Sequence, residues 1–238
     1  MAVTFFDPVA ISGLGIGTNW VLQSGSPSTS RNRAQGLKTN GDEAASQLYG
    51  GQTSQTLEFK NFQSSGDTGD SGNAIPSAGK CASGWHVDSV SVSYSPTDWP
   101  TLSVQVHKHD DCETGVTSHA SQANTYTASL ELPMGFGVPS DIKTIVGISD
   151  STIGLSAFSY EMSVTHQDEV GGSGNYLASE DRDGSESASV STVGVPSADP
   201  DIDGWDMLSD STNASNTTAD TATYSFEHHV QRDEDDED

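Results

Sequence analysis

Positive charge is scarce in this sequence. Nine Lys and Arg residues stand against 34 Asp and Glu residues, which gives a net charge of -25 over 238 residues. Such a charge keeps a chain soluble by self-repulsion and opposes the tight binding of a polyanion. We therefore exclude nucleic acid as a tightly held ligand, although DNA in transit along a repelling surface is compatible with the charge.

Long apolar runs are also missing. No stretch approaches the roughly 18 apolar residues that a membrane span needs, and residues 1–8 lack the basic start of a secretory signal. Only 32% of the residues are hydrophobic, which favours thin sheets with long polar loops over a large core. We expect a protein that has no membrane partner and is assembled in a cytoplasm.

Motifs that mark catalysis are absent as well. The sequence contains no GxSxG, HExxH or CxxC, the short patterns that place a nucleophile, a zinc-binding helix or a reactive thiol pair. We therefore predict that the protein is not an enzyme, and we expect no cofactor other than calcium.

What the sequence does contain is alternation of apolar and polar residues. Leu102, Val104 and Val106 alternate with polar neighbours, which is the period of a half-buried strand. Similar patterns or short apolar runs predict strands at 18–23, 55–60, 85–94, 126–132, 142–148, 158–164, 186–195 and 224–228. The predicted fold is all-β, an antiparallel β-sandwich or partly closed barrel with long polar loops and at most one short helix.

One hairpin is defined by its loop. SerProThrAspTrpPro at 95–100 carries two prolines between two alternating stretches, and proline cannot continue a ladder. The alternation slips by one between Val87 and Val90, which predicts a bulge around Ser89. The two strands must therefore turn back on each other at this loop.

Only two cysteines are present, Cys81 and Cys112. If the hairpin turns between Pro96 and Thr97, the two cysteines fall opposite each other, and a disulfide between them is geometrically permitted. The alternative is a pair of reduced thiols in a protein assembled in a cytoplasm. A zinc site built on cysteine is not expected from so few thiols.

The remaining segments define the predicted organisation of the chain. AspGluAlaAlaSerGlnLeuTyrGly at 42–50 predicts a short helix, and Gly-, Ser-, Asn- and Asp-rich segments predict loops at 24–41, 63–79, 171–185 and 209–221. We divide the chain into an extended N-terminal arm (1–40), a β-sandwich domain (41–232) and a disordered acidic tail (233–238).

Two patterns suggest metal binding. Asp199, Asp201, Asp203 and Asp210 have the spacing of a calcium-binding loop, although Pro200 and the lack of flanking helices favour an acidic, solvated loop. In the second pattern, His107 and His109 share one strand face, so two imidazoles could reach one ion. That face is also expected to be the solvent face, where an HxH pattern arises easily.

A related pattern of strand, histidine and acid recurs at 102–111, 160–169 and, more loosely, 224–234. In a subunit repeated around an axis, such strand ends would form rims that line an interface or a channel. We therefore predict that the following residues serve assembly: His107, His109, Asp110, Asp111, His166, Asp168, Glu169 and His228.

A family resemblance rests on three stretches: the long hairpin at 84–106, AsnGlyAspGluAlaAlaSer at 40–46, and TyrSerPheGluHisHis at 224–229. In these the chain resembles a structural protein of a tailed phage or virus particle, most closely a major tail tube protein. The resemblance implies a virion protein assembled in the host cytoplasm. Its copies would stack as homo-oligomeric rings, hexamers in such tubes, contact other tail proteins and form a conduit for DNA.

Two alternatives stay open. One is a different virion role, such as a capsid decoration or another outer protein. The other is an extracellular calcium-dependent adhesion or carbohydrate-binding module, in which the loop at 199–210 and exposed Trp85, Trp99 and Trp205 would form the site.

Overall fold

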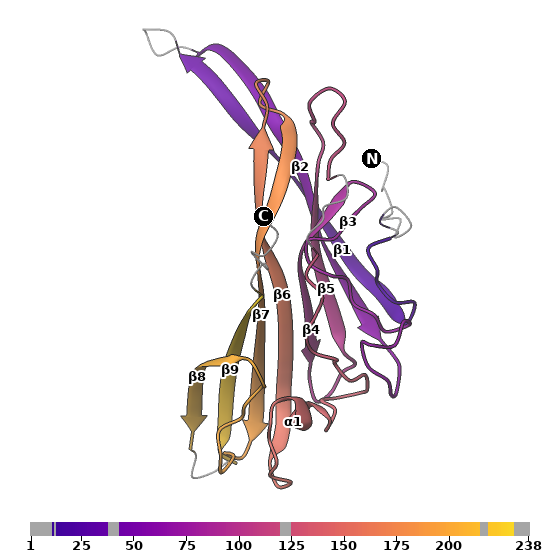
Figure 1. Cartoon of the computed structure of the whole chain (residues 1–238), viewed down its shortest axis with the longest axis vertical. Coiled ribbons are helices and arrows are strands. Elements are labelled where there is room, and N and C mark those ends of the chain that lie inside the picture. The colour runs from indigo at the N-terminus through magenta and orange to yellow at the C-terminus, as the bar shows by residue number, and fades with distance from the viewer. Residues whose placement is uncertain (1–10, 12, 38–42, 120–124, 215–218, 231–238) are drawn as a thin grey trace, which may run out of the picture.

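Antiparallel strands make up nearly all of the regular structure in the computed structural model, which describes residues 11, 13–37, 43–119, 125–214 and 219–230 (Figure 1). The predicted all-β fold with one short helix is confirmed. The elements in chain order are β1 (Trp20–Leu37), β2 (Glu43–Asn61), β3 (Cys81–Ala82), β4 (Trp85–Tyr94), β5 (Thr101–His109), α1 (Ile142–Ile145), β6 (Gly154–Val170), β7 (Tyr176–Val193), β8 (Asp206–Asn213) and β9 (Thr221–Val230).

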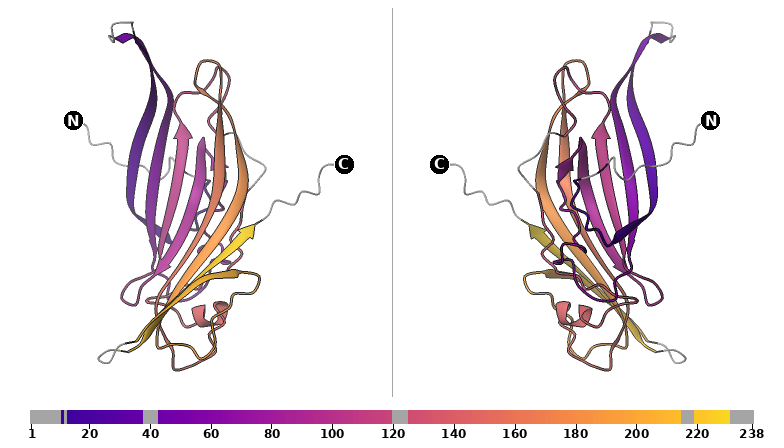
Figure 2. Two further views of the ribbon diagram at one scale, coloured as in Figure 1. Left: turned by 90° about the vertical axis from the view of Figure 1, so that its left-hand side faces the viewer. Right: turned by 90° about the vertical axis from the view of Figure 1, so that its right-hand side faces the viewer.

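The strands form one open sheet in the order β1-β2-β5-β4-β6-β7-β9-β8, and β3 pairs with β4 off this path. Every pairing along the path is antiparallel. The sheet is twisted and curved, and β1 and β2 reach past the ends of the central strands (Figure 2). Among the described residues, no helix is long and apolar enough to cross a membrane.

One face of the sheet carries the hydrophobic core. Successive side chains of a strand point to opposite faces, so the central strands place every second residue inward. Loop residues and α1 form an irregular second layer over this face. Buried members of the core include Val90, Val92, Leu102, Val104, Phe158, Tyr160 and Val190 from strands, and Leu14, Leu132, Ile142 and Ile202 from α1 and the loops.

The β4–β5 hairpin is confirmed in detail. Its strands are joined by residues 95–100, and the ladder register shifts between Val87 and Ser89, where the sequence predicts a bulge. The extra residue in that bulge is Asp88. The bulge therefore adds an acidic side chain at the beginning of β4, beside the histidines described below.

The strand predicted at 18–23 is confirmed from Trp20 onward, but the two predictions that follow it are wrong where the structure describes those residues. The loop expected at 24–41 and the helix expected at 42–50 are strands: β1 runs to Leu37 and β2 begins at Glu43. The arm expected over 1–40 is therefore part of the sheet from Trp20 onward. Residues 1–10 and the predicted acidic tail at 233–238 lie outside the described residues.

Elsewhere, predicted strands and loops exchange places. The strand expected at 126–132 is a loop with an isolated bridge from Tyr126 to Ala78, and the strand expected at 142–148 contains α1. Both segments bury apolar side chains, so burial was correctly indicated while the backbone conformation was not. Conversely, the loops expected at 171–185 and 209–221 contain much of β7, the end of β8 and the first residue of β9.

The register that permits a disulfide is also wrong. Ser83 and Gly84, both with positive φ, reverse the chain, so that Cys81 pairs with His86 in the short β3–β4 ladder. The backbone of Cys112 instead forms an isolated parallel β-bridge with Tyr176. Both cysteines lie among the described residues, and both are thiols with no disulfide between them.

Candidate functional site

A row of ionisable side chains crosses four neighbouring strands at the beginning of β4. His86 on β4 pairs with His107 on β5, and His166 on β6 pairs with Asp181 on β7. The ring centroids of His86 and His166 lie 4.1 Å apart, and Nε2 of His86 lies 2.9 Å from Oδ1 of Asp181. The pairing register of the sheet thus brings together four side chains that are far apart in the sequence.

Two further histidines join this row. The ring of His109, at the end of β5, stacks on Tyr176 at the start of β7 with 4.2 Å between centroids. His119 comes from the loop after β5, and its ring centroid lies 5.0 Å from that of His109. The hydroxyl of Ser118 holds this loop in place by donating to the carbonyl of Gly84 and accepting from the N–H of His109. We call the following five residues the histidine cluster: His86, His107, His109, His119 and His166.

The cluster is largely shielded from solvent. The exposed fraction of the side chain is 0% for His86, 4% for His107, 7% for His109 and 11% for His166, and residue His119 is 3% exposed. The backbone of His119 has φ +45°, a left-handed conformation uncommon for a residue other than glycine. Burying five imidazoles together is costly unless their nitrogens find partners.

Two carboxylates orient three of the rings. Oδ1 of Asp88 lies 2.9 Å from Nδ1 of His86 and 2.6 Å from Nδ1 of His107. Oδ1 of Asp181, whose side chain is fully buried, lies 2.9 Å from Nε2 of His86 and 2.6 Å from Nδ1 of His166. His86 therefore bridges Asp88 and Asp181, and both of its ring nitrogens are used.

A third carboxylate lies at the solvent side of the cluster. Oδ1 of Asp168 is 2.8 Å from Nε2 of His166. Its Oδ2 is 3.1 Å from Nε2 of His109, but the two groups are not aligned for a hydrogen bond. Asp168 thus pairs firmly with His166 and only electrostatically with His109.

These contacts raise the pKa of some histidines in the cluster, whereas the pKa values of others are lowered. Burial alone lowers the pKa of a histidine, but hydrogen bonds to Asp181 and Asp88 outweigh it and raise the pKa of His86. Asp168 and Asp181 likewise outweigh burial and raise the pKa of His166 to about 9. Hydrogen bonds to His107 and His86 overcome the opposing effect of burial on Asp88 and lower its pKa to about 2.

Two other rings, those of His119 and His107, have lowered pKa values and are kept neutral. Burial, reinforced by the neighbouring histidines, lowers the pKa of His119 to about 2. Burial also lowers the pKa of His107, and the hydrogen bond to Asp88 only partly offsets it. Neutral imidazole has one nitrogen with a free lone pair, and that lone pair is what a metal ion binds.

Three nitrogens of the cluster have no hydrogen-bond partner although they are buried: Nε2 of His107, of His109 and of His119. The potential ligand atoms of these three residues and of His166 all lie within 4.8 Å of one another. Two smaller groups that involve His86 have similar spacing, one with His166 and Asp181 and one with Asp88 and His107. Imidazole nitrogens in such an arrangement can bind zinc or a similar transition metal.

The structure places the predicted assembly residues in several environments. His107, His109, His166 and Asp168 come together in or beside the histidine cluster. Asp110 accepts a hydrogen bond from Thr53, Asp111 lies 4.0 Å from Arg31, and Glu169 is exposed. Because these three histidines are largely buried within one chain, the members of the predicted set that remain available to another subunit are the acids and His228, whose side chain is 32% exposed.

The four aspartates of the predicted calcium loop do not converge. Asp199, Asp201 and Asp203 lie in the loop before β8, whereas Asp210 lies on β8 and pairs with Tyr224. Among the described residues, these four are not part of any group close enough to hold a metal. They stay apart because Asp210, the last residue of the predicted set, lies on the extended strand β8 and not in the loop.

Sequence reasoning missed His86, His119, Asp88 and Asp181. His86 and Asp181 stand one strand away from predicted site residues, and only the pairing register reveals their proximity. Asp88 had a signal, because the predicted bulge adds one side chain next to His86. His119 had none, since it depends on the path of a polar loop.

A second buried acid lies on β7. The side chain of Glu186 is fully buried and accepts hydrogen bonds from the backbone N–H and hydroxyl of Ser129, from the hydroxyl of Tyr160 and from Nδ1 of His228. His228, predicted for assembly, thus pairs within its own chain. These hydrogen bonds outweigh the opposing effect of burial and lower the pKa of Glu186.

We expect Glu186→Gln to lower the free energy of unfolding by about 1–3 kcal/mol, because an amide nitrogen cannot accept hydrogen bonds from the surrounding donors. A lowered folded-state pKa stabilises the fold above the ordinary pKa near 4.5 and stops doing so as the pH falls through the lowered value. Urea denaturation from pH 3 to pH 7 should therefore show the full difference at neutral pH and a smaller one in acid. A difference that grows in acid would contradict this assignment.

Beyond these clusters, one part of the sheet extends outside the body of the molecule. β2 pairs with β5 only from Gln52 to Lys60, whereas the pairing of β1 with β2 continues outward from Asn32 and Tyr49 to Leu37 and Glu43. In Figure 1 this part projects past the other strands. We call residues 32–37 and 43–49 the ribbon. Within the described part of the chain, its two strands pair only with each other.

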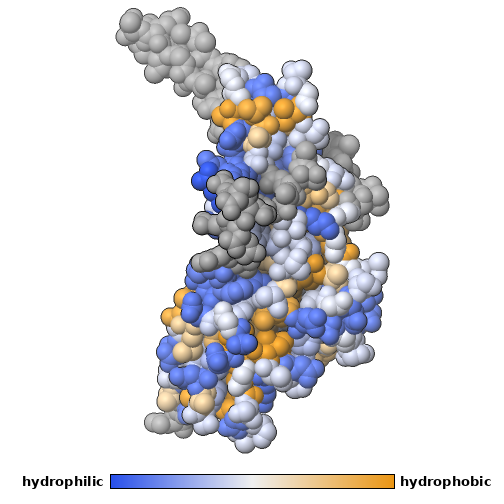
Figure 3. Space-filling view, viewed as in Figure 1, coloured by the Kyte–Doolittle hydropathy of each residue, from blue (hydrophilic) through white to orange (hydrophobic). Residues whose placement is uncertain are grey.

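In the described part of the structure, no further strand pairs with either edge of the sheet. β1 forms one edge, and β8 forms the other. Every residue of β8 is exposed, including Met207 at 44% and Leu208 at 60%. On the face shown in Figure 3, small apolar patches lie between hydrophilic residues. An exposed edge strand presents unpaired backbone groups that can pair with another chain.

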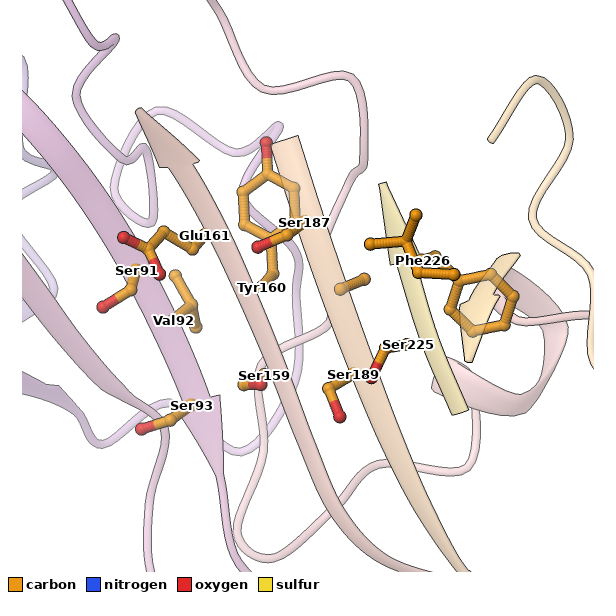
Figure 4. Close-up of a pocket in the computed structure, with 12 residues that line it drawn as sticks. Ser91, Val92, Ser93, Ser159, Tyr160, Glu161, Ser187, Ser189, Ser225 and Phe226 are labelled. Carbon is orange, nitrogen blue, oxygen red and sulfur yellow. The ribbon is translucent and has the colours of Figure 1, made fainter. Parts of the chain in front are cut away.

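The face of the sheet opposite the core is lined by hydroxyl groups. Ser93, Ser159, Ser189 and Ser225 pair in turn across β4, β6, β7 and β9. With neighbouring serines they line an open depression of about 320 Å³ (Figure 4). Glu161 also lines it, and none of the lining residues is basic.

The tryptophans expected to form a carbohydrate site are mostly buried. Trp85 is 7% exposed and carries Lys108 over its ring, and Trp205 is 9% exposed and packs against His228. Trp99 is partly exposed and contacts Phe62 and Phe136. Stacking of sugars on Trp85 or Trp205 would require their removal from the core.

Comparison with known proteins gives no further guidance: no protein-family profile matches the chain, and no curated protein has a significantly similar sequence.

Proposed function

We propose that this protein is a self-assembling structural subunit of a virus particle, with copies that stack as rings to form a tail tube. The observation that carries the proposal is the ribbon, which leaves the sheet and pairs with nothing else in the described chain. The family resemblance of the hairpin at 84–106 points to the same function.

The ribbon needs a partner on physical grounds. A two-stranded ribbon is marginally stable in water by itself, and three or more strands or a packing surface are usually required. Among the residues that the structure describes, no third strand pairs with the ribbon. A neighbouring copy would supply one, or a surface on which the ribbon packs, and its contacts would then link one ring to the next.

The edges favour assembly in the plane of a ring. β1 and β8 lie at opposite ends of the strand order, so the β8 edge of one copy could meet the β1 edge of the next around a closed ring. Such head-to-tail contacts generate rings when the rotation closes. The opposing force is the net charge of -25, which makes copies repel one another at low salt.

The serine-lined face is the surface best suited to the lumen. Its hydroxyls are uncharged, Glu161 adds negative charge, and no basic residue lines its depression. DNA phosphates would find no cation to bind there, so DNA would pass through the tube without being held. Other tail proteins would contact the ends of the tube.

Sedimentation velocity of the purified chain tests the proposal. Over a series of protein concentrations, each at low and high salt, we expect monomers at low salt and assemblies far larger than dimers at high salt, because salt screens the repulsion. A monomer at every concentration and salt would overturn the proposal. A compact trimer with no larger species would favour a capsid decoration protein instead.

A further inference from the structure

We propose that the histidine cluster is a transition-metal site in which His107, His109, His119 and His166 bind one zinc ion or a similar divalent ion. This site is independent of the tail function and lies within a single chain. Its role is to fasten the loop that carries His119 onto β5 and β6.

The unpartnered nitrogens are the first argument. Nε2 of His107 and of His119 are buried without a hydrogen-bond partner, and Nε2 of His109 is buried with only the carboxylate of Asp168 nearby, 3.1 Å away and not aligned for a hydrogen bond. A buried polar atom without a partner costs about 1–3 kcal/mol, and three such atoms side by side are unusual in a folded protein. A cation among them would satisfy all three at once.

The orientation of the rings is the second argument. The Nδ1 atom of His107 lies 2.6 Å from Asp88, and the Nδ1 atom of His166 lies 2.6 Å from Asp181. A hydrogen bond from Nδ1–H to a carboxylate fixes the tautomer that leaves Nε2 for the metal, and metal-binding histidines commonly have such a partner. Two of the four proposed ligands thus already have the outer hydrogen bond typical of a metal site.

His86 completes this outer layer and is not itself a ligand. Its two nitrogens bridge Asp88 and Asp181, so it holds both carboxylates in position behind His107 and His166. The Nδ1 atom of His119 lies 3.4 Å from the hydroxyl of Ser179. This contact engages Nδ1, so the buried Nε2 atom of His119, which has no hydrogen-bond partner, is the nitrogen left for a metal.

Distance and charge suit a four-coordinate divalent ion. Zinc binds imidazole nitrogen at about 2.0–2.1 Å, so four nitrogens now within 4.8 Å of one another need only a small inward movement. His166 pairs with a carboxylate through both ring nitrogens, so on binding it would release its Nε2 proton to solvent and exchange its contact with Asp168 for the metal. Asp88, Asp168 and Asp181 would balance the charge of the ion, and the all-nitrogen donor set disfavours calcium and magnesium, which prefer oxygen.

The test measures how tightly the full, untagged chain binds zinc. Bound metal is first stripped with a chelator, and the chelator is then removed. Isothermal titration with Zn²⁺, in excess Ca²⁺ to occupy surface carboxylates, should give one tight site per chain. Zinc at about 100 times its dissociation constant should raise the melting temperature by about 5–10 °C, and Ca²⁺ alone should not. The visible absorption of bound Co²⁺ should report four-coordinate geometry.

Variants assign the site to these residues. His119→Ala removes a ligand that lies outside the sheet, and the affinity for Zn²⁺ should fall about 100-fold or more. Asp88→Asn leaves all four ligands but weakens an outer hydrogen bond, which typically costs about 10- to 100-fold in affinity. His229→Ala is the matched control, because the His229 side chain is 66% exposed and His229 pairs with Ser185, four residues along β7 from Asp181.

The outcomes separate clearly. Tight binding that is lost in His119→Ala and kept in His229→Ala supports the site. The absence of a tight site in the wild-type chain overturns the proposal, and so does binding that His119→Ala leaves unchanged. If His119→Ala does not fold, the wild-type titration and Asp88→Asn decide the matter. Sedimentation measured with and without zinc tests the tail function separately.

Discussion

Replacing residues 33–48 with an Asn-Gly turn is expected to leave a folded chain that no longer forms large assemblies. The replacement joins Asn32 to Tyr49, which already pair across the ladder, and Asn-Gly favours the two-residue turns that close such hairpins. It removes most of the ribbon and keeps the pairing of β2 with β5 from Gln52 to Lys60. If neighbouring copies hold the ribbon, its loss removes their contact while the body of the fold stays intact.

Two measurements check this variant. Circular dichroism and thermal melting should match the full chain at low salt, because the removed strands pair with no other described segment. Sedimentation at high salt should then show monomers or single rings where the full chain forms long assemblies. A shortened chain that still forms tubes of normal length would show that the ribbon does not link rings.

Asp181→Ala is expected to lower the free energy of unfolding by about 3–5 kcal/mol, the typical cost of removing one partner from a buried charge pair. The Asp181 carboxylate is fully buried and lies within 3.0 Å of His86 and 2.6 Å of His166. Its removal leaves two buried imidazoles, both with raised pKa values, without the carboxylate that they share. Urea denaturation at neutral pH, with a chelator present, measures the loss.

Asp183→Ala is the matched control for this prediction. Asp183 lies two residues away on the same strand and is exposed, so its removal should change the unfolding free energy by no more than about 0.5 kcal/mol. Equal effects of the two substitutions would mean that the histidine–carboxylate network contributes nothing beyond its surface charge.

The sequence predicts those parts of the fold in which one face is buried and the other is exposed. Val90 and Val92 on β4, and Leu102 and Val104 on β5, alternate with polar residues because the core covers one face of these strands. The bulge around Ser89 can be predicted for the same reason, since an extra residue interrupts the regular alternation of apolar and polar side chains. Tertiary packing and sequence period agree in this hairpin.

The missed strands have no such contrast between faces. Residues 24–31 of β1 and all of β8 are polar or exposed along most of their length, so no period of two appears. Their strand conformation comes from pairing with neighbours that are distant in the sequence. The same reason explains the predicted helix at 42–50, where good local helix formers pair with β1 instead.

Only part of the candidate site could be predicted from the sequence, for a related reason. The HxH pattern at His107 and His109 correctly suggests that two imidazoles share a face, but an isolated strand cannot show that a loop covers this face. His119 arrives through that loop, and His166 arrives through the register of β6. A site assembled from four separate segments follows from topology and not from spacing along the chain.

Electron cryomicroscopy of the full chain at high salt tests the central claim of self-assembly most directly. The account predicts stacked rings in which the ribbon of each copy packs on a copy in the adjacent ring and the serine-lined face borders the lumen. Particles in which the ribbon projects freely into solvent, or fields that contain only monomers, would contradict it.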